Sequence, residues 1–144
     1  NLKLLLMGKG YDQLDDQITS LGIADHIVKT GYVDEPTKLA LLSAADALIY
    51  TSLYEGFGLP LLEAFEHSLP VLTSPNSSLQ EVAGDAAIYA DPRDSQSIAD
   101  GIVEVVQPGV QEELIRKGHV RLASYDPALA RRKMLDVIIE LWKN

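Results

Sequence analysis

Residues 51–74 read TSLYEGFGLPLLEAFEHSLPVLTS, and this stretch decides how the chain folds. An apolar run ends near Ser52, and the helical pattern that follows is interrupted by Gly56, Gly58 and Pro60. Proline is favoured at the first helical position, and glycine is tolerated just before it. The stretch therefore predicts a strand, then a glycine-containing loop, then a helix that begins at about Pro60.

The same alternation extends through most of the chain. Apolar runs of strand length lie at residues 2–8, 27–33, 46–52, 69–74 and 86–90, with helical patterns at 11–22, 34–45, 60–68 and 77–84. After residue 91 only helical patterns follow, at 95–106, 110–125 and 127–144. Nearly continuous hydrophobicity is typical of parallel strands that are buried on both faces. We predict an α/β fold, a three-layer α/β/α Rossmann-like domain with a mostly parallel sheet.

Composition limits the size and the kind of partner. A chain of 144 residues, 47% hydrophobic, is expected to form a single domain over residues 1–144. Its net charge of -9 disfavours nucleic acid as a partner, since nucleic-acid surfaces need a basic stripe. No apolar run approaches the roughly 20 residues of a membrane span. The chain starts directly on a strand-like run without methionine, so we expect a piece of a longer protein.

The glycine-containing loop is predicted to bind an oxygen-rich anionic ligand. Loop N–H groups that have no helical partner lie next to the positive end of the helix dipole, namely those of Gly56, Phe57, Gly58 and Leu59. Glu55 is expected in the loop and Glu63 in the first helical turn. Carboxylates are poor phosphate ligands but good acceptors for hydroxyl groups. A nucleotide sugar, with hydroxyls at both ends of a diphosphate, has the required shape.

The segment YEGFGLPLLEAFEHSLPVLTS resembles the E-x7-E segment of the retaining glycosyltransferases of the GT-B fold, the group 1 or family 4-like enzymes. The segments GKG (8–10), TGYVDEPTKLALLSAADALIYTS (30–52) and SLQEVAGDAAIYADPRDSQSIADGI (78–102) match in the family's order. The resemblance implies the C-terminal, nucleotide-sugar-binding half of a GT-B fold, with the domain's first strand and helix missing. It also implies that the helix at 127–144 crosses to an absent N-terminal domain.

The resemblance assigns the sugar end of the site to the loop. Glu55 would have the catalytic role and accept hydrogen bonds from hydroxyls of the transferred sugar. The N–H groups of Gly56, Phe57 and Gly58 would lie alongside. The rings of Phe57 and Tyr54 are interpreted as ligand contacts or as core or rim aromatics, and both readings stay open.

The resemblance assigns the nucleotide end to two segments. Leu59 and Pro60 would lie near the ribose and phosphate, and Glu63 would bind the ribose hydroxyls. Tyr32 and Val33, at the end of a predicted strand, would border the base. One departure concerns packing: the family usually has glycine at the position of Ser68, a left-handed helix end that serine fills less well.

The implied activity is transfer of a sugar from a nucleoside-diphosphate sugar to a hydroxyl acceptor (glycan, lipid or small molecule), with retained configuration. No cofactor and no metal ion are expected. The partner would be an N-terminal acceptor domain of the same polypeptide. The expected location is the cytoplasm, and peripheral association with the membrane is left open. The family's phosphate-binding arginine and lysine lie upstream of Asn1, so this chain alone is expected to be inactive. The alternatives are a nucleotide-sugar epimerase of the same architecture and a non-catalytic doubly wound binding or regulatory module.

Overall fold

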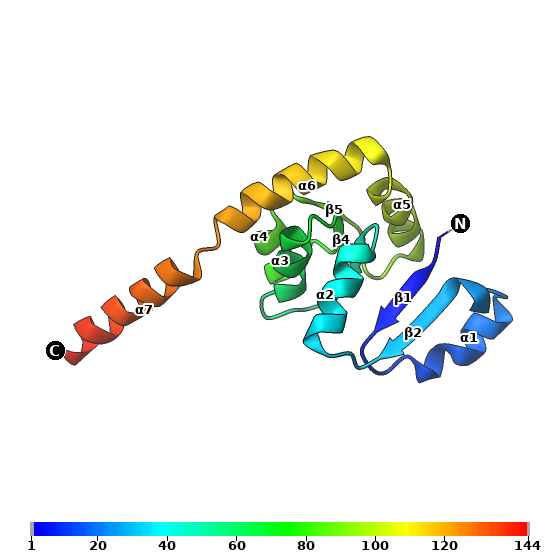
Figure 1. Ribbon diagram of the computed structural model, residues 1–144, viewed down its shortest axis with the longest axis horizontal. Helices are drawn as coiled ribbons and strands as arrows, with labels where there is room; N and C mark the ends of the chain where they lie inside the picture. The colour runs from blue at the N-terminus through cyan, green and yellow to red at the C-terminus, as the bar shows by residue number, and fades with distance from the viewer. Residues whose placement is uncertain (1, 144) are drawn as a thin grey trace. The chain divides into compact units, whose positions relative to one another are not determined.

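The computed structural model describes residues 2–143, apart from the side chain of Pro127, and forms two compact units. The first unit ends at Leu41 and the second begins at Leu42, so the boundary falls within the helix α2 (Glu35–Ala44). Each strand predicted from the sequence is present within its predicted range, and each predicted helix is present (Figure 1).

The first unit contains a parallel pair of strands. β1 (Leu4–Met7) pairs with β2 (Ile27–Gly31), with Leu4 opposite Ile27 and Met7 opposite Gly31. Three short helices connect the strands: η1 (Asp12–Leu14), α1 (Asp15–Ser20) and η2 (Ala24–His26). Lys29 of β2 forms an ion pair with Asp15 at the start of α1, which ties the connecting segment to the sheet.

The strands of the first unit are more exposed than their sequence predicts. Leu4 and Met7 of β1 are 43% and 39% exposed, and none of the described residues from 2 to 41 is buried. Within this unit alone, these strands are therefore not buried on both faces. A two-stranded sheet next to a six-residue helix offers too little surface to cover both of its faces.

The second unit is built around a three-stranded parallel sheet in the order β3, β4, β5. The strands are β3 (Leu48–Tyr50), β4 (Val71–Thr73) and β5 (Ala87–Tyr89). Leu48 lies opposite Val71, which lies opposite Ala87. All three residues of β4 are buried, as expected for the central strand of a parallel sheet covered on both faces.

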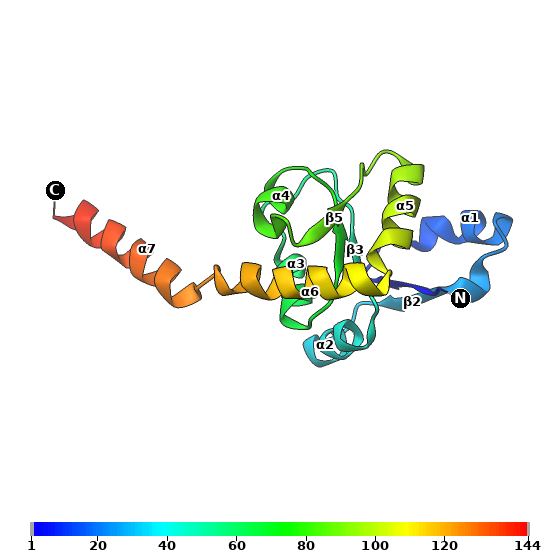
Figure 2. The same cartoon turned by 90° about the horizontal axis from the view of Figure 1, so that it is seen from above.

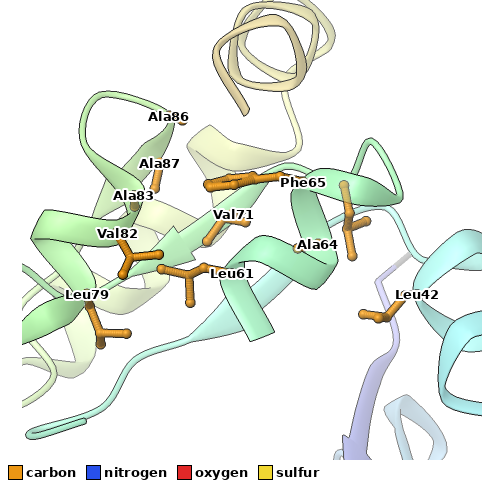
Figure 3. Close-up of a cluster of buried hydrophobic side chains, with 11 residues drawn as sticks. Leu42, Leu61, Ala64, Phe65, Val71, Leu79, Val82, Ala83, Ala86 and Ala87 are labelled. Carbon is orange, nitrogen blue, oxygen red and sulfur yellow. The ribbon is translucent and has the colours of Figure 1, made fainter. Parts of the chain in front are cut away.

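Helices cover the two faces of this sheet, which confirms the α/β fold class. Val71 and Leu72 point to opposite faces, since side chains alternate along a strand. Val71 belongs to a cluster with residues of α3 (Leu59–Glu66) and α4 (Ser78–Ala83), including Leu61, Phe65 and Leu79 (Figure 3). Leu72 belongs to a second cluster, with residues of α5 (Ser95–Val105) and α6 (Pro108–Ala123).

The helix α6 runs alongside α3 (Figure 2). Gly118 and Ser68 both contribute to this contact. A Cβ at Gly118 of α6 would lie 2.8 Å from the Cδ1 atom of Phe65, so only glycine allows this approach. After α3 the chain turns through Ser68, whose φ of 55° confirms the left-handed helix end expected there. The Ser68 hydroxyl is hydrogen-bonded to Nε2 of His119 in α6, 2.9 Å away.

The last helix, α7 (Pro127–Trp142), is capped by Asp126, whose carboxylate accepts hydrogen bonds from the N–H groups of Ala128 and Leu129. Its side chains from Ala128 to Trp142 are all exposed. They include the large apolar residues Leu129, Met134, Leu135, Val137, Ile138, Ile139, Leu141 and Trp142. The helix that the sequence predicts at 127–144 is therefore present over Pro127–Trp142.

Candidate functional site

The glycine-containing loop, residues 51–58, connects the carboxyl end of β3 to the start of α3. It lies beside the carboxyl end of β4. The Ser52 N–H donates to Oγ of Ser74, the residue after β4, over 3.0 Å. The Ser74 hydroxyl in turn donates to the carbonyl of Ser52. In open α/β sheets, ligands bind at the carboxyl ends of parallel strands, which is where this loop lies.

Glu55 is held within this loop through both its side chain and its backbone. The Tyr50 hydroxyl, at the end of β3, donates to Oε1 of Glu55 over 2.8 Å. The Glu55 N–H donates to Oγ of Ser77 at 3.0 Å, and the Ser78 hydroxyl donates to the Glu55 carbonyl at 3.0 Å. Burial, with the hydrogen bond and negative charge of Glu55, raises the pKa of Tyr50 to about 12, so the phenol remains a donor at neutral pH.

Ser77 adopts an unusual backbone conformation, with φ 50° and ψ -136°, immediately before α4. For a residue other than glycine such a conformation costs roughly 1–3 kcal/mol, and it persists only where surrounding contacts impose it. Here the Ser77 hydroxyl accepts the hydrogen bond from Glu55, and the next hydroxyl, that of Ser78, donates to the same residue. The strained turn therefore places two hydroxyl groups against Glu55.

The far side of the loop is fixed by an aromatic contact. The ring of Phe57 meets the ring of Tyr125 edge-on, with centroids 6.0 Å apart. The guanidinium of Arg121 lies 5.4 Å from the Tyr125 centroid, and its Nε donates to the carbonyl of Val82 at the end of α4. The Phe57 side chain is thus a rim aromatic, while Tyr54 is 80% exposed.

Gly58 ends the loop in a left-handed conformation, with φ 104°, and caps α3. A Cβ at this position would lie 2.8 Å from Cδ2 of Leu79, so both the conformation and the packing require glycine. Among the described residues, no hydrogen bond is formed by the N–H groups of Gly56, Phe57 and Gly58. These groups can donate to a bound ligand.

The helix α3 begins one residue earlier than predicted, at Leu59, with Pro60 in its first turn. Glu63 is consequently the fifth residue of the helix, so its expected place in the first helical turn is wrong. It is partly exposed. Leu59 is exposed and, with Phe57 and Tyr125, lines an apolar groove of about 400 Å³ beside the loop.

The predicted base-bordering residues belong to the first unit. Tyr32 and Val33 follow β2 directly and precede α2. The Tyr32 side chain is 81% exposed, and that of Val33 is partly buried. The second unit brings together the other predicted residues, from Glu55 to Glu63, on one loop and the helix that it leads into.

Sequence reasoning missed Tyr50, Ser74, Ser77 and Ser78, which fix the loop. A signal was available for the serines: the run SPNSS at residues 74–78 follows the strand adjacent to β3, and the carboxyl ends of adjacent parallel strands meet at one edge. Tyr50 lies inside a strand-like run, where an aromatic residue is ordinary, so the sequence offers no comparable signal.

Among residues 2–143 no group of three histidine, cysteine, aspartate or glutamate side chains is arranged to hold a metal ion. Within the same described part of the chain, no helix has the length and apolar character needed to cross a membrane.

Comparison with known proteins decides the family. The sequence profile described as "Glycosyl transferases group 1" matches residues 1–120. The chain belongs to the group 1 glycosyltransferases. Within this family it is 43% identical, over 84 residues, to an O-antigen chain mannosyltransferase B of Escherichia coli. That match covers 58% of this chain and 22% of the relative.

Solved structures share the fold of this group 1 glycosyltransferase chain. Sucrose-phosphate synthase from Thermosynechococcus elongatus superposes with a TM-score of 0.86 at 22% identity, covering 98% of this chain and 39% of that one. Anabaena HepE in complex with UDP and glucose superposes with a TM-score of 0.83 at 20% identity, covering 96% and 40%. The chain therefore spans about two fifths of each of these structures, and 22% to 31% of the first curated relatives that it matches.

Proposed function

We propose that this chain is the donor-binding domain of a retaining glycosyltransferase that moves a sugar from a nucleoside-diphosphate sugar to a hydroxyl acceptor. The observation that carries the proposal is the loop of residues 51–58. Glu55 is held there by Tyr50 through its carboxylate and by Ser77 and Ser78 through its backbone, next to N–H groups that form no hydrogen bond among the described residues. Acceptors for sugar hydroxyls and donors for phosphate oxygens thus lie within one short segment.

In this proposal the loop binds the sugar and the helix binds the nucleotide. Glu55 accepts hydrogen bonds from sugar hydroxyls, and the N–H groups of Gly56, Phe57 and Gly58 donate to the sugar and diphosphate. The positive end of the α3 dipole favours the anionic diphosphate. Glu63 accepts from the ribose hydroxyls, with Leu59 and Pro60 nearby and Tyr32 and Val33 beside the base.

The catalytic contribution of such a loop is electrostatic. Negative charge develops on the departing diphosphate as the glycosidic bond breaks, and one positioned hydrogen-bond donor is typically worth about 3–4 kcal/mol in such a step. We propose that no metal ion or cofactor takes part. The acceptor, whether glycan, lipid or small molecule, would be held by an N-terminal domain of the same polypeptide, to which α7 crosses. Transfer would require that domain, so the 144-residue chain binds the donor without turnover.

Titration calorimetry of the chain against a panel of nucleotides tests the proposal. The panel contains UDP, GDP, ADP and dTDP, each as the free diphosphate and as a hexose conjugate. We expect saturable binding of at least one nucleotide and tighter binding of its matching sugar conjugate, since only the conjugate reaches Glu55. If no member of the panel gives a heat of binding or raises the melting temperature of the chain, a donor-binding role is contradicted and a non-catalytic module is favoured.

A further inference from the structure

Tyr50 links the core of the second unit to the loop. Its ring packs against the cluster that contains Leu61 and Phe65, and its hydroxyl donates to Oε1 of Glu55 over 2.8 Å. The packing of the ring does not require the hydroxyl, because that cluster is apolar. Among the described residues, the hydroxyl has one hydrogen-bond partner, which is the carboxylate proposed to bind the sugar.

The remaining contacts of Glu55 leave one carboxylate oxygen for a ligand. Oε1 accepts from Tyr50, while Oε2 accepts no hydrogen bond from the residues that the structure describes. Ser77 and Ser78 bind the backbone N–H and carbonyl of the same residue, so the side chain starts from a fixed position. Glu55 is therefore held at both ends and presents Oε2 in a defined direction.

We propose that Tyr50 is a positioning residue for Glu55, and that it raises the preference of this site for a nucleoside-diphosphate sugar over the free nucleoside diphosphate. The proposal rests on the function proposed above for Glu55. The hydroxyl restricts rotation of the carboxylate, so that a sugar hydroxyl meets an acceptor that is already in place. Without the hydroxyl, the carboxylate rotates and is hydrated, and binding has to order it again. The nucleotide makes no contact with Glu55 and loses nothing.

The test compares Tyr50→Phe with Tyr89→Phe in the 144-residue chain. Both rings pack against the same cluster and both substitutions remove one phenolic oxygen, but the Tyr89 hydroxyl donates to the carbonyl of Gly84 and not to Glu55. The probes are UDP, GDP, ADP and dTDP, each paired with its hexose conjugate (for example UDP-glucose or GDP-mannose) and titrated by calorimetry. For the pair that binds, Tyr50→Phe should weaken binding of the nucleotide sugar about three- to tenfold, the usual effect of one hydrogen bond. The free nucleotide should bind within about twofold of wild type, and Tyr89→Phe should change neither affinity.

A double-mutant cycle assigns the effect to Glu55. If Tyr50 acts through this carboxylate, adding Tyr50→Phe to Glu55→Ala should not weaken sugar binding further. Two results would overturn the positioning role: a nucleotide-sugar affinity of Tyr50→Phe within twofold of wild type, or equal losses for the sugar and the free nucleotide. A full additional loss in the Glu55→Ala background would also overturn it.

The outcomes separate this role from the proposed function. If wild type binds no member of the full panel of UDP, GDP, ADP and dTDP and their hexose conjugates, donor binding itself is contradicted, and the positioning role fails with it. If wild type binds a nucleotide sugar more tightly than the free nucleotide and Tyr50→Phe does the same by the same margin, donor binding stands and only the positioning role fails.

Discussion

The loop at residues 51–58 is irregular and the helix α7 is regular, yet the loop is the more firmly attached of the two. Tyr50 of β3 and the two serines at the start of α4, Ser77 and Ser78, bind Glu55. Phe57 packs on Tyr125. In α7 the side chains from Ala128 to Trp142 are exposed. Regular hydrogen bonding within an element thus says little about its attachment to the core. Residues that bind ligands benefit from fixed surroundings, whereas a helix with exposed apolar side chains is suited to a partner surface.

The largest expected difference comes from shortening one leucine in each region. Leu61, in the helix that follows the loop, is fully buried, whereas Leu135 of α7 is 51% exposed. Leu61→Ala should lower the free energy of unfolding by about 2–5 kcal/mol, through lost burial and a cavity. Leu135→Ala should change it by less than about 0.5 kcal/mol in this chain. Urea denaturation measures both, and a loss above 1 kcal/mol for Leu135→Ala would mean that α7 packs on this chain after all.

The two glycines of the loop offer the next comparison. Gly58→Ala introduces a Cβ 2.8 Å from Leu79 at a φ of 104°, so we expect a loss of about 2–4 kcal/mol in unfolding free energy from strain and overpacking. Gly56→Ala is the control, because a Cβ there meets no heavy atom within 4 Å. Thermal unfolding of both variants measures the difference. Equal stability of the two variants would show that the end of the loop is mobile rather than fixed.

The smallest expected effect concerns the caps of two helices. Asp126 caps α7 and Asp94 caps α5, each through a carboxylate that accepts backbone N–H groups. Each substitution by alanine should destabilise its own helix by about 1 kcal/mol. Because α5 packs on the sheet, Asp94→Ala should lower the urea midpoint of the whole second unit. Asp126→Ala should reduce helicity by circular dichroism and leave that midpoint unchanged. A lowered midpoint in Asp126→Ala would indicate that α7 unfolds together with the core.

Local patterns predicted the parts of this chain that depend on neighbouring residues. The strand β4 and the glycine-containing loop could each be read from short segments, because hydrophobic runs, glycine and proline act over a few residues. The family resemblance then pointed to Glu55 and Glu63. These features were enough for the fold class and for the position of the loop.

Contacts between distant segments could not be predicted in the same way. The bonds from Tyr50, Ser77 and Ser78 to Glu55 depend on how adjacent strand ends meet, and the strained φ of Ser77 has no signature in the sequence. Hydrophobicity likewise shows that a strand such as β1 can be buried and does not show which segment covers it.

The most direct test of the donor-binding account compares Glu63→Ala with Glu55→Ala by titration calorimetry, against a nucleoside diphosphate and its sugar conjugate. Glu63→Ala should weaken binding of both ligands by about 1–3 kcal/mol, because both carry the ribose hydroxyls. Glu55→Ala should leave the affinity for the free nucleoside diphosphate unchanged and weaken only that for the sugar conjugate. Equal losses for both ligands in both variants would contradict the assignment of Glu55 to the sugar and Glu63 to the ribose.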